Sequence, residues 1–186
     1  MLTNQIATFK KVSLEQYIKD VQKLNSTLSV EQITEYYNDI KIPSRATSGS
    51  VGYDFYLPFD MVLNNGEYIV IPTGIRCEIE EGYSLDIYPK SGLGFKNFTT
   101  LANTIGIIDA DYFYSDNEGH IMVKFINKGF NTTRYTYNPE DDVYKRLIRH
   151  KGESFVQGIF HECFGVTNDN DNTTMKIRNG GFDSTR

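Results

Sequence analysis

The 186-residue sequence contains no tryptophan, only two cysteines and no long run of apolar residues. Cys77 and Cys163 are too few for a disulfide framework, and no close Cys/His set has the spacing of a zinc site. No segment is long enough to span a bilayer, and residues 1–11 lack the apolar core of a signal peptide. These absences argue against a disulfide-rich secreted domain, a zinc module and a membrane protein, and we expect a cytoplasmic protein with free thiols.

Positive charge is also scarce, with 19 Lys and Arg against 24 Asp and Glu and a formal net charge of -5. Proteins that bind polymeric nucleic acid usually present a basic surface. We therefore expect no nucleic-acid polymer and no membrane among the partners. An anionic small molecule remains compatible with this composition where Lys and Arg gather locally.

Aromatic residues and glycine are abundant instead, with 13 Tyr, 12 Phe and 15 Gly, and they favour strands and turns. From residue 42 onward, short apolar segments alternate with turn residues, which predicts one all-β domain, either a barrel or a jelly roll. The expected strands are 53–57, a hairpin of 61–63 and 68–71 around a turn at 64–67, then 75–79, 83–88, 119–127 and 152–164. Residues 129–151 are predicted to form a long surface connection with a helical turn at 143–149.

The first 40 residues have a different, helical pattern. Ser13 with Gln16, and Ser29 with Gln32, have the spacing of a capping box. Apolar residues then recur at helical spacing in both segments, with a turn at 25–27 between them. We expect a helical hairpin in an N-terminal extension (1–42), a β domain (43–175) and a mobile C-terminal arm (176–186).

Residues 106–112 have the sequence Gly-Ile-Ile-Asp-Ala-Asp-Tyr. In an extended chain Asp109 and Asp111 would point to the same face. Paired carboxylates suit proton abstraction, because their surroundings can tune one of them as a base. Taken alone, however, the run is more typical of a strand that ends in a turn with two solvated acids.

Four further stretches, taken together with this run, favour a functional role for its acids over an ordinary turn. Residues 46–55 form a Gly/Ser loop that runs into Asp54, and residues 88–96 offer backbone N–H groups, a hydroxyl and a cation for an oligophosphate. Residues 152–159 are typical of a turn before a buried strand. Residues 178–185 place a Gly-Gly-Phe in a polar tail, where the aromatic ring could stack on a planar ligand. Each stretch alone is typical of an ordinary turn, strand or tail.

In this order and at these separations, the five stretches resemble the five motifs of the homotrimeric deoxyuridine triphosphatases (dUTP diphosphatases, dUTPases). The insert at 115–120 and the sequence of residues 157–160 resemble those of a subgroup from Gram-positive bacteria and their phages. The resemblance implies a jelly-roll (dUTPase-like, β-clip) subunit and a homotrimer with active sites at the subunit interfaces. It also implies Mg²⁺-dependent hydrolysis of dUTP to dUMP and diphosphate.

The same resemblance implies roles for individual residues. Asp109 is the base that activates a water for attack on the α-phosphorus, whereas Asp111 is structural. Asp54 helps to hold the water shell of the metal ion. The residues implied to contact substrate all lie in or beside the five stretches; they are Lys90, Ser91, Gly92, Asn103, Ile107, Ile108, Tyr112, Met122, Gln157, Arg178, Phe182, Ser184 and Thr185.

In these implied contacts, different stretches bind the sugar, the uracil and the phosphates of the substrate. Tyr112 stacks against the deoxyribose, and Asn103 with the backbone of 107–122 forms a hairpin that reads the uracil edge. Lys90, Ser91, Gly92 and Gln157 hold phosphates. The C-terminal stretch stacks Phe182 on uracil and adds Arg178, Ser184 and Thr185 to the phosphates.

The match departs from the usual motifs at a few positions. Lys90 stands where the family usually has Arg, so a point charge replaces a bidentate fork. Asp183 and Arg186 stand where glycines are usual. Two other functions remain open: a phage-type regulatory, protein-binding member of the same fold, and a dCTP deaminase-like enzyme. The deaminase needs a glutamate that acts on the nucleobase, and the sequence of residues 109–112 argues against that function.

Overall fold

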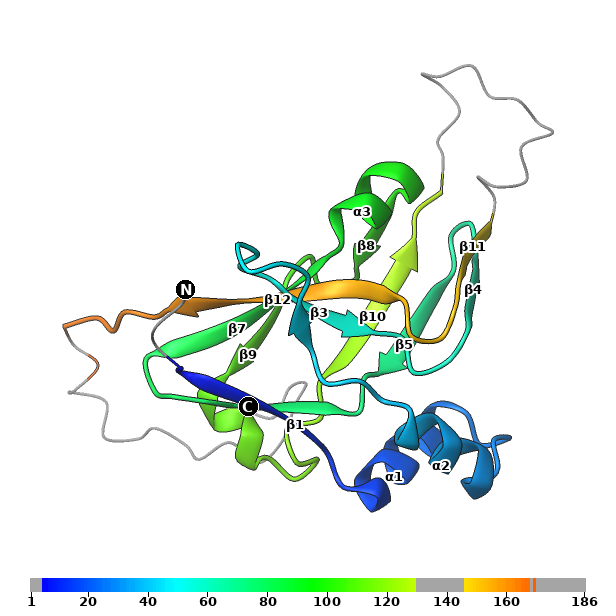
Figure 1. The fold of residues 1–186 in the computed structure, drawn as a ribbon, viewed down its shortest axis with the longest axis horizontal. Coiled ribbons are helices and arrows are strands. Elements are labelled where there is room, and N and C mark those ends of the chain that lie inside the picture. The colour runs from blue at the N-terminus through cyan, green and yellow to red at the C-terminus, as the bar shows by residue number, and fades with distance from the viewer. Residues whose placement is uncertain (1–4, 130–145, 168, 170–186) are drawn as a thin grey trace.

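The computed structural model describes residues 5–129, 146–167 and 169, and strands dominate this part of the chain (Figure 1). The strands are β1 (Ala7–Lys11), β2 (Ser44–Arg45), β3 (Tyr53–Tyr56), β4 (Met61–Asn64), β5 (Tyr68–Pro72), β6 (Ile75–Ile79), β7 (Tyr83–Pro89), β8 (Thr99–Leu101), β9 (Gly106–Asp109), β10 (Met122–Asn127), β11 (Arg146–Arg149) and β12 (Ser154–Glu162). The helices are α1 (Leu14–Leu24), α2 (Val30–Asn38), α3 (Ser91–Asn97) and the 3-10 helix η1 (Ala110–Tyr114).

The strands are distributed over several small antiparallel sheets. A five-stranded sheet has the order β2-β3-β12-β7-β9, and a three-stranded sheet has the order β5-β10-β8. Two further pairs, β1 with β6 and β11 with β4, complete the set. Phe125 of β10 and Phe155 of β12 are both fully buried and meet edge to face, with ring centroids 6.2 Å apart. The two larger sheets therefore share one hydrophobic core.

The predicted helical hairpin is present as α1 and α2, which lie side by side at one end of the molecule (Figure 1). The capping box of α2 is complete, because Ser29 and Gln32 exchange side-chain and backbone hydrogen bonds. That of α1 is only half formed, because Gln16 turns its side chain to Asp20 instead. None of the helices in the described part of the chain has the length and apolar content that crossing a membrane requires.

Several predicted elements were wrong or missed. The turn at 64–67 exists, but β4 and β5 do not pair as a hairpin, because each joins a different sheet. Where a helical turn was expected at 143–149, Arg146–Arg149 is the strand β11, which pairs with β4; residues 143–145 lie outside the described part. The sequence pattern also missed β1, which pairs along its length with β6, and the short helix α3.

Candidate functional site

Three of the five predicted stretches meet where β3, β12 and β7 lie next to one another in the five-stranded sheet. Gln157 of β12 lies opposite Asp54 of β3 on one side and opposite Tyr88 of β7 on the other. The backbone N–H of Lys90 donates to the carbonyl of Phe155 at 3.2 Å, which fixes the start of the turn after β7. Stretches 46–55, 88–96 and 152–159 therefore form one continuous surface, although they are far apart in the sequence.

Asp54 and Lys90 form an ion pair at this surface. The Lys90 ammonium lies 2.7 Å from Oδ1 and 2.9 Å from Oδ2 of Asp54, whose side chain is mostly buried. An ammonium has three N–H donors, so two can engage the carboxylate while the third faces an incoming anion. The pair offsets the cost of burying the carboxylate and holds the lysine at the mouth of the turn.

Ser91 and Gly92 follow directly, as the exposed first residues of α3, for which Lys90 is the N-cap. Gly52, in the loop before β3, packs against Gln157: a Cβ at residue 52 would lie 2.7 Å from Gln157 Oε1. A side chain at residue 52 would therefore push aside the flexible end of the Gln157 side chain. Backbone N–H groups, a hydroxyl, an amide and a cation thus gather at one end of β7, which is the donor set that a phosphate group needs.

Asp109 lies elsewhere, at the end of β9, where it faces Ser84 at the start of β7. The chain then turns into η1, as expected for a strand that ends in a turn, so Asp109 and Asp111 do not share an extended face. Asp111 is exposed on the 3-10 helix, whereas Asp109 is partly buried. The two acids therefore have different surroundings.

Tyr112 is buried, and its hydroxyl is held from two sides. It donates to the carbonyl of His120 at 2.9 Å and accepts from the Asn117 amide at 2.9 Å. Ile107 is 63% exposed, and Met122 is partly buried at the start of β10. Because β9 pairs with β7 and β10 pairs with β5 and β8, residues 107–122 do not form a paired hairpin. The helix η1 and the insert at 115–120 separate the two strands.

The remaining predicted contacts lie near these residues or outside the described part. Asn103 is exposed in the turn before β9, and Ile108 is partly buried within β9. Arg178, Phe182, Ser184 and Thr185, together with the whole predicted arm, lie outside the described residues.

The structure therefore places the predicted residues in two groups within one chain. Asp109 is level with Ser84, and Lys90 follows about six residues later along an extended strand, which corresponds to a separation of roughly 20 Å. Asp109, Tyr112 and the residues around β9 form one group, and Asp54, Lys90, Ser91 and Gln157 form the other. No single chain brings both groups to one phosphate.

A divalent metal has limited protein ligands here. Within the described ranges, no cluster of three His, Cys, Asp or Glu side chains has the arrangement of a metal site. Mg²⁺ commonly keeps several waters and binds through one or two carboxylates plus the phosphates of a substrate. The single carboxylate of Asp54, beside the phosphate-binding donors, fits a metal that arrives on a polyphosphate.

The sequence of this chain is similar to those of known dUTPases. The dUTPase family model matches residues 38–138. A deoxyuridine 5'-triphosphate nucleotidohydrolase of Lactococcus lactis is 35% identical over 157 residues, which cover 83% of this chain and 95% of the relative. The chain belongs to the dUTPase family.

Solved structures show the same fold. The crystal structure of the dUTPase from Streptococcus mutans matches with a TM-score of 0.56 and 25% identity, over 69% of this chain and 90% of that one. A mutant dUTPase from phage phi11 of S. aureus, described with a structural Mg(II) ion, matches with a TM-score of 0.54 and 20% identity, over 69% of this chain and 87% of that one. The predicted dUTPase-like jelly-roll class is confirmed.

Proposed function

We propose that this chain hydrolyses dUTP to dUMP and diphosphate, as the names of its relatives describe for them. The observation that carries the proposal is the family match over residues 38–138, which includes both the Asp54–Lys90 pair and the Asp109 turn. The two groups of residues supply the functions that the reaction needs: phosphate donors in one and a base in the other.

In the proposed reaction, Asp109 takes a proton from a water molecule. The water oxygen forms a bond to the α-phosphorus, the bond from that phosphorus to the α,β-bridging oxygen breaks, and diphosphate leaves. The proton on Asp109 then returns to solvent. Positioned general bases contribute about 10²–10⁴-fold to such steps, and the remaining acceleration comes from positioning and charge neutralisation.

The residues at the end of β7 bind the triphosphate in this proposal. The ammonium of Lys90, the hydroxyl of Ser91, the backbone N–H of Gly92 and the amide of Gln157 are donors for the triphosphate oxygens. Mg²⁺ bound to the triphosphate would neutralise further charge, and Asp54 would hold its water shell. Because Asp54 is already paired with Lys90, it can do so without leaving an uncompensated buried charge.

Recognition of the nucleoside falls to the group around β9. The ring of Tyr112, whose hydroxyl makes two hydrogen bonds, lies against the deoxyribose, where a 2′-hydroxyl would clash. Asn103 and the backbone beside Ile107 and Ile108 pair with the uracil edge. A site built to satisfy particular hydrogen-bonding edges rejects analogues strongly, because a mispaired buried group is costly.

The separation of the two groups supports sites between subunits of a homotrimer. A base and a phosphate turn that are roughly 20 Å apart in one chain can meet only when a neighbouring chain supplies one of them. Among the described strands, β9 pairs only with β7, so its other edge, which includes the 63% exposed Ile107, is open to such a neighbour. The proposed C-terminal contacts, Phe182 above all, would complete the site.

Hydrolysis of dUTP in ¹⁸O-labelled water tests the proposal. The wild-type protein with Mg²⁺ should yield dUMP and diphosphate in equal amounts, with the label in dUMP because water attacks the α-phosphorus. Label in the diphosphate would contradict that attack, and no dUMP at high protein concentration would refute the activity. Formation of dUTP from dCTP would favour the deaminase alternative.

A further inference from the structure

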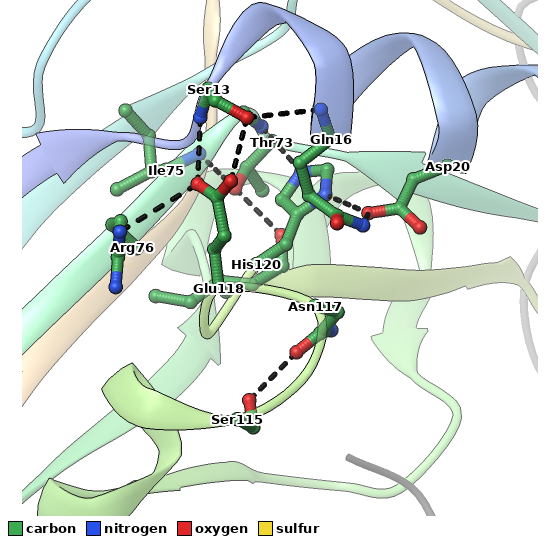
Figure 2. Close-up of polar contacts among 12 residues, drawn as sticks. Ser13, Gln16, Asp20, Thr73, Ile75, Arg76, Ser115, Asn117, Glu118 and His120 are labelled. Atoms are coloured by element: carbon green, nitrogen blue, oxygen red, sulfur yellow. Dashed lines mark hydrogen bonds and ion pairs between the residues drawn. The ribbon is translucent and has the colours of Figure 1, made fainter. Parts of the chain in front are cut away.

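A buried histidine connects the N-terminal helix α1 to the turn that follows the proposed base (Figure 2). His120 is fully buried, and its ring lies between Asp20 of α1 and the backbone of Gly74. The N–H of Gly74 donates to Nε2 at 2.8 Å, so the imidazole proton resides on Nδ1. Nδ1 then donates to Oδ2 of Asp20 at 2.7 Å.

Asp20 is built for this contact. It is 4% exposed and lies on the apolar side of α1, and the Gln16 amide donates to the same Oδ2 at 2.8 Å. Burial acts to raise the pKa of Asp20, but the hydrogen bonds from His120 and Gln16 outweigh it and hold that pKa below its ordinary value. The carboxylate is therefore ionised at neutral pH, and both of its donors come from fixed positions.

A second contact ties the same helix to the insert. Glu118 accepts from the Ser13 N–H at 2.8 Å and from the Ser13 hydroxyl at 2.6 Å, which gives α1 a cap from a distant segment (Figure 2). Arg76 lies 3.6 Å from Glu118 and donates to the carbonyl of Phe113 at 2.6 Å. Burial acts to raise the pKa of Glu118, but the Ser13 hydrogen bonds and the Arg76 charge hold it below its ordinary value.

The insert in turn folds back onto Tyr112. His120 supplies the carbonyl that accepts the Tyr112 hydroxyl proton, and Asn117 donates its amide to the same hydroxyl. The Ser115 hydroxyl lies 2.7 Å from the carbonyl of Tyr112. Gly119 has a φ of 69°, and a Cβ there would lie 2.7 Å from that carbonyl oxygen, so the turn packs too tightly for a side chain.

We propose that helix α1 positions the sugar-recognising tyrosine: Asp20 fixes His120, and His120 with Asn117 fixes the hydroxyl of Tyr112. Asp20, His120 and Asn117 are positioning residues, because each acts through Tyr112 in this proposal. The proposal rests on the proposed function for its meaning in substrate choice. It gives the N-terminal extension and the insert a shared role, which is to hold the ring rigid enough to discriminate deoxyribose from ribose.

The test compares kcat/KM for dUTP with kcat/KM for UTP. Asp20→Leu should lower the dUTP-to-UTP ratio by about fivefold, the factor that one net hydrogen bond commonly contributes. Asp20→Asn keeps an acceptor for His120 and should restore most of the ratio. Ser29→Ala is the matched control, because it removes the cap of α2 and destabilises the same hairpin without touching the network.

Two further measurements test whether the effect passes through the Tyr112 hydroxyl. In a Tyr112→Phe background, Asp20→Leu should change the ratio no further, because the coupling passes through the missing hydroxyl. Amide hydrogens of residues 110–120 should exchange faster in Asp20→Leu than in Ser29→Ala, and Asn117→Leu should show the same exchange if Asp20→Leu does not fold.

The outcomes separate the two claims. An unchanged substrate ratio and unchanged exchange in Asp20→Leu, or equal changes in Ser29→Ala, would overturn the positioning role. A wild-type protein that does not hydrolyse dUTP would refute the proposed function alone, because the exchange measurement needs no turnover.

Discussion

Two inactive variants of this chain should restore each other's activity when they assemble into one trimer. Within one chain Asp109 lies level with the start of β7 and Lys90 follows its end, roughly 20 Å away by the rise of an extended strand. Attack on phosphorus needs the reacting atoms about 3–3.5 Å apart. In the proposed trimer, each site therefore takes Asp109 from one subunit and Lys90 from the next.

The perturbation pairs Asp109→Asn with Lys90→Gln, in two differently tagged chains that are co-expressed and purified over both tags. The glutamine keeps an amide donor for the buried Asp54, so the fold should be preserved. Asp109→Asn alone should lose about 10²–10⁴-fold in kcat. Lys90→Gln alone should bind the triphosphate weakly.

The expected recovery follows from the symmetry of the ring. Every doubly tagged trimer contains two copies of one variant and one of the other. In either case, only one of the three junctions joins an intact Asp109 to an intact Lys90. Hybrid trimers should therefore show about one third of the wild-type kcat.

The assay is steady-state diphosphate release from dUTP with Mg²⁺. Hybrids of two differently tagged Asp109→Asn chains serve as the control and should stay inactive. Hybrid activity no greater than that of the two parents together would refute the argument that the site is divided between subunits.

Two predictions concern the ionisable groups. Since the folded-state pKa of Asp20 is lowered, the stabilisation from its carboxylate is present above the unfolded pKa of about 3.9 and is lost as pH falls through the folded pKa. The difference in melting temperature between wild type and Asp20→Asn should therefore be present at pH 7 and should narrow below about pH 4. A difference independent of pH would contradict this. Burial raises the pKa of the Cys77 thiol to about 12, whereas Cys163 is exposed, so a thiol reagent should label one cysteine in the native protein and both after unfolding; rapid native labelling of Cys77 would contradict its burial.

Local sequence signals predicted the parts of the fold that depend on local physics. The capping box at Ser29 and the apolar period after it define α2, because the hydrogen bonds involved join residues three positions apart. The alternation of Ile75, Cys77 and Ile79 likewise predicted β6 and its buried face. Strand partners were not predictable in this way: β4 pairs with β11, whose Arg-Leu-Ile-Arg sequence has too much charge to signal a strand.

For the candidate site, too, local signals were predictable from the sequence and contacts between distant segments were not. The motif residues and their order identified the family, but the sequence did not predict that Asp54 pairs with Lys90, because the contact joins two strands through the sheet. The network around His120 was also missed. Its one local signal is an acid, Asp20, on the apolar side of a helix, where a buried carboxylate requires a partner.

The most direct test of the proposed chemistry separates binding from turnover in Asp109→Asn. This variant should bind dUTP within a few-fold of the wild-type Kd, measured by calorimetry with Mg²⁺, because the phosphate donors and Tyr112 are unchanged. Its single-turnover rate of dUMP formation should fall by about 10²–10⁴-fold, the contribution of a positioned base. A rate within a few-fold of the wild-type value would contradict Asp109 as the base.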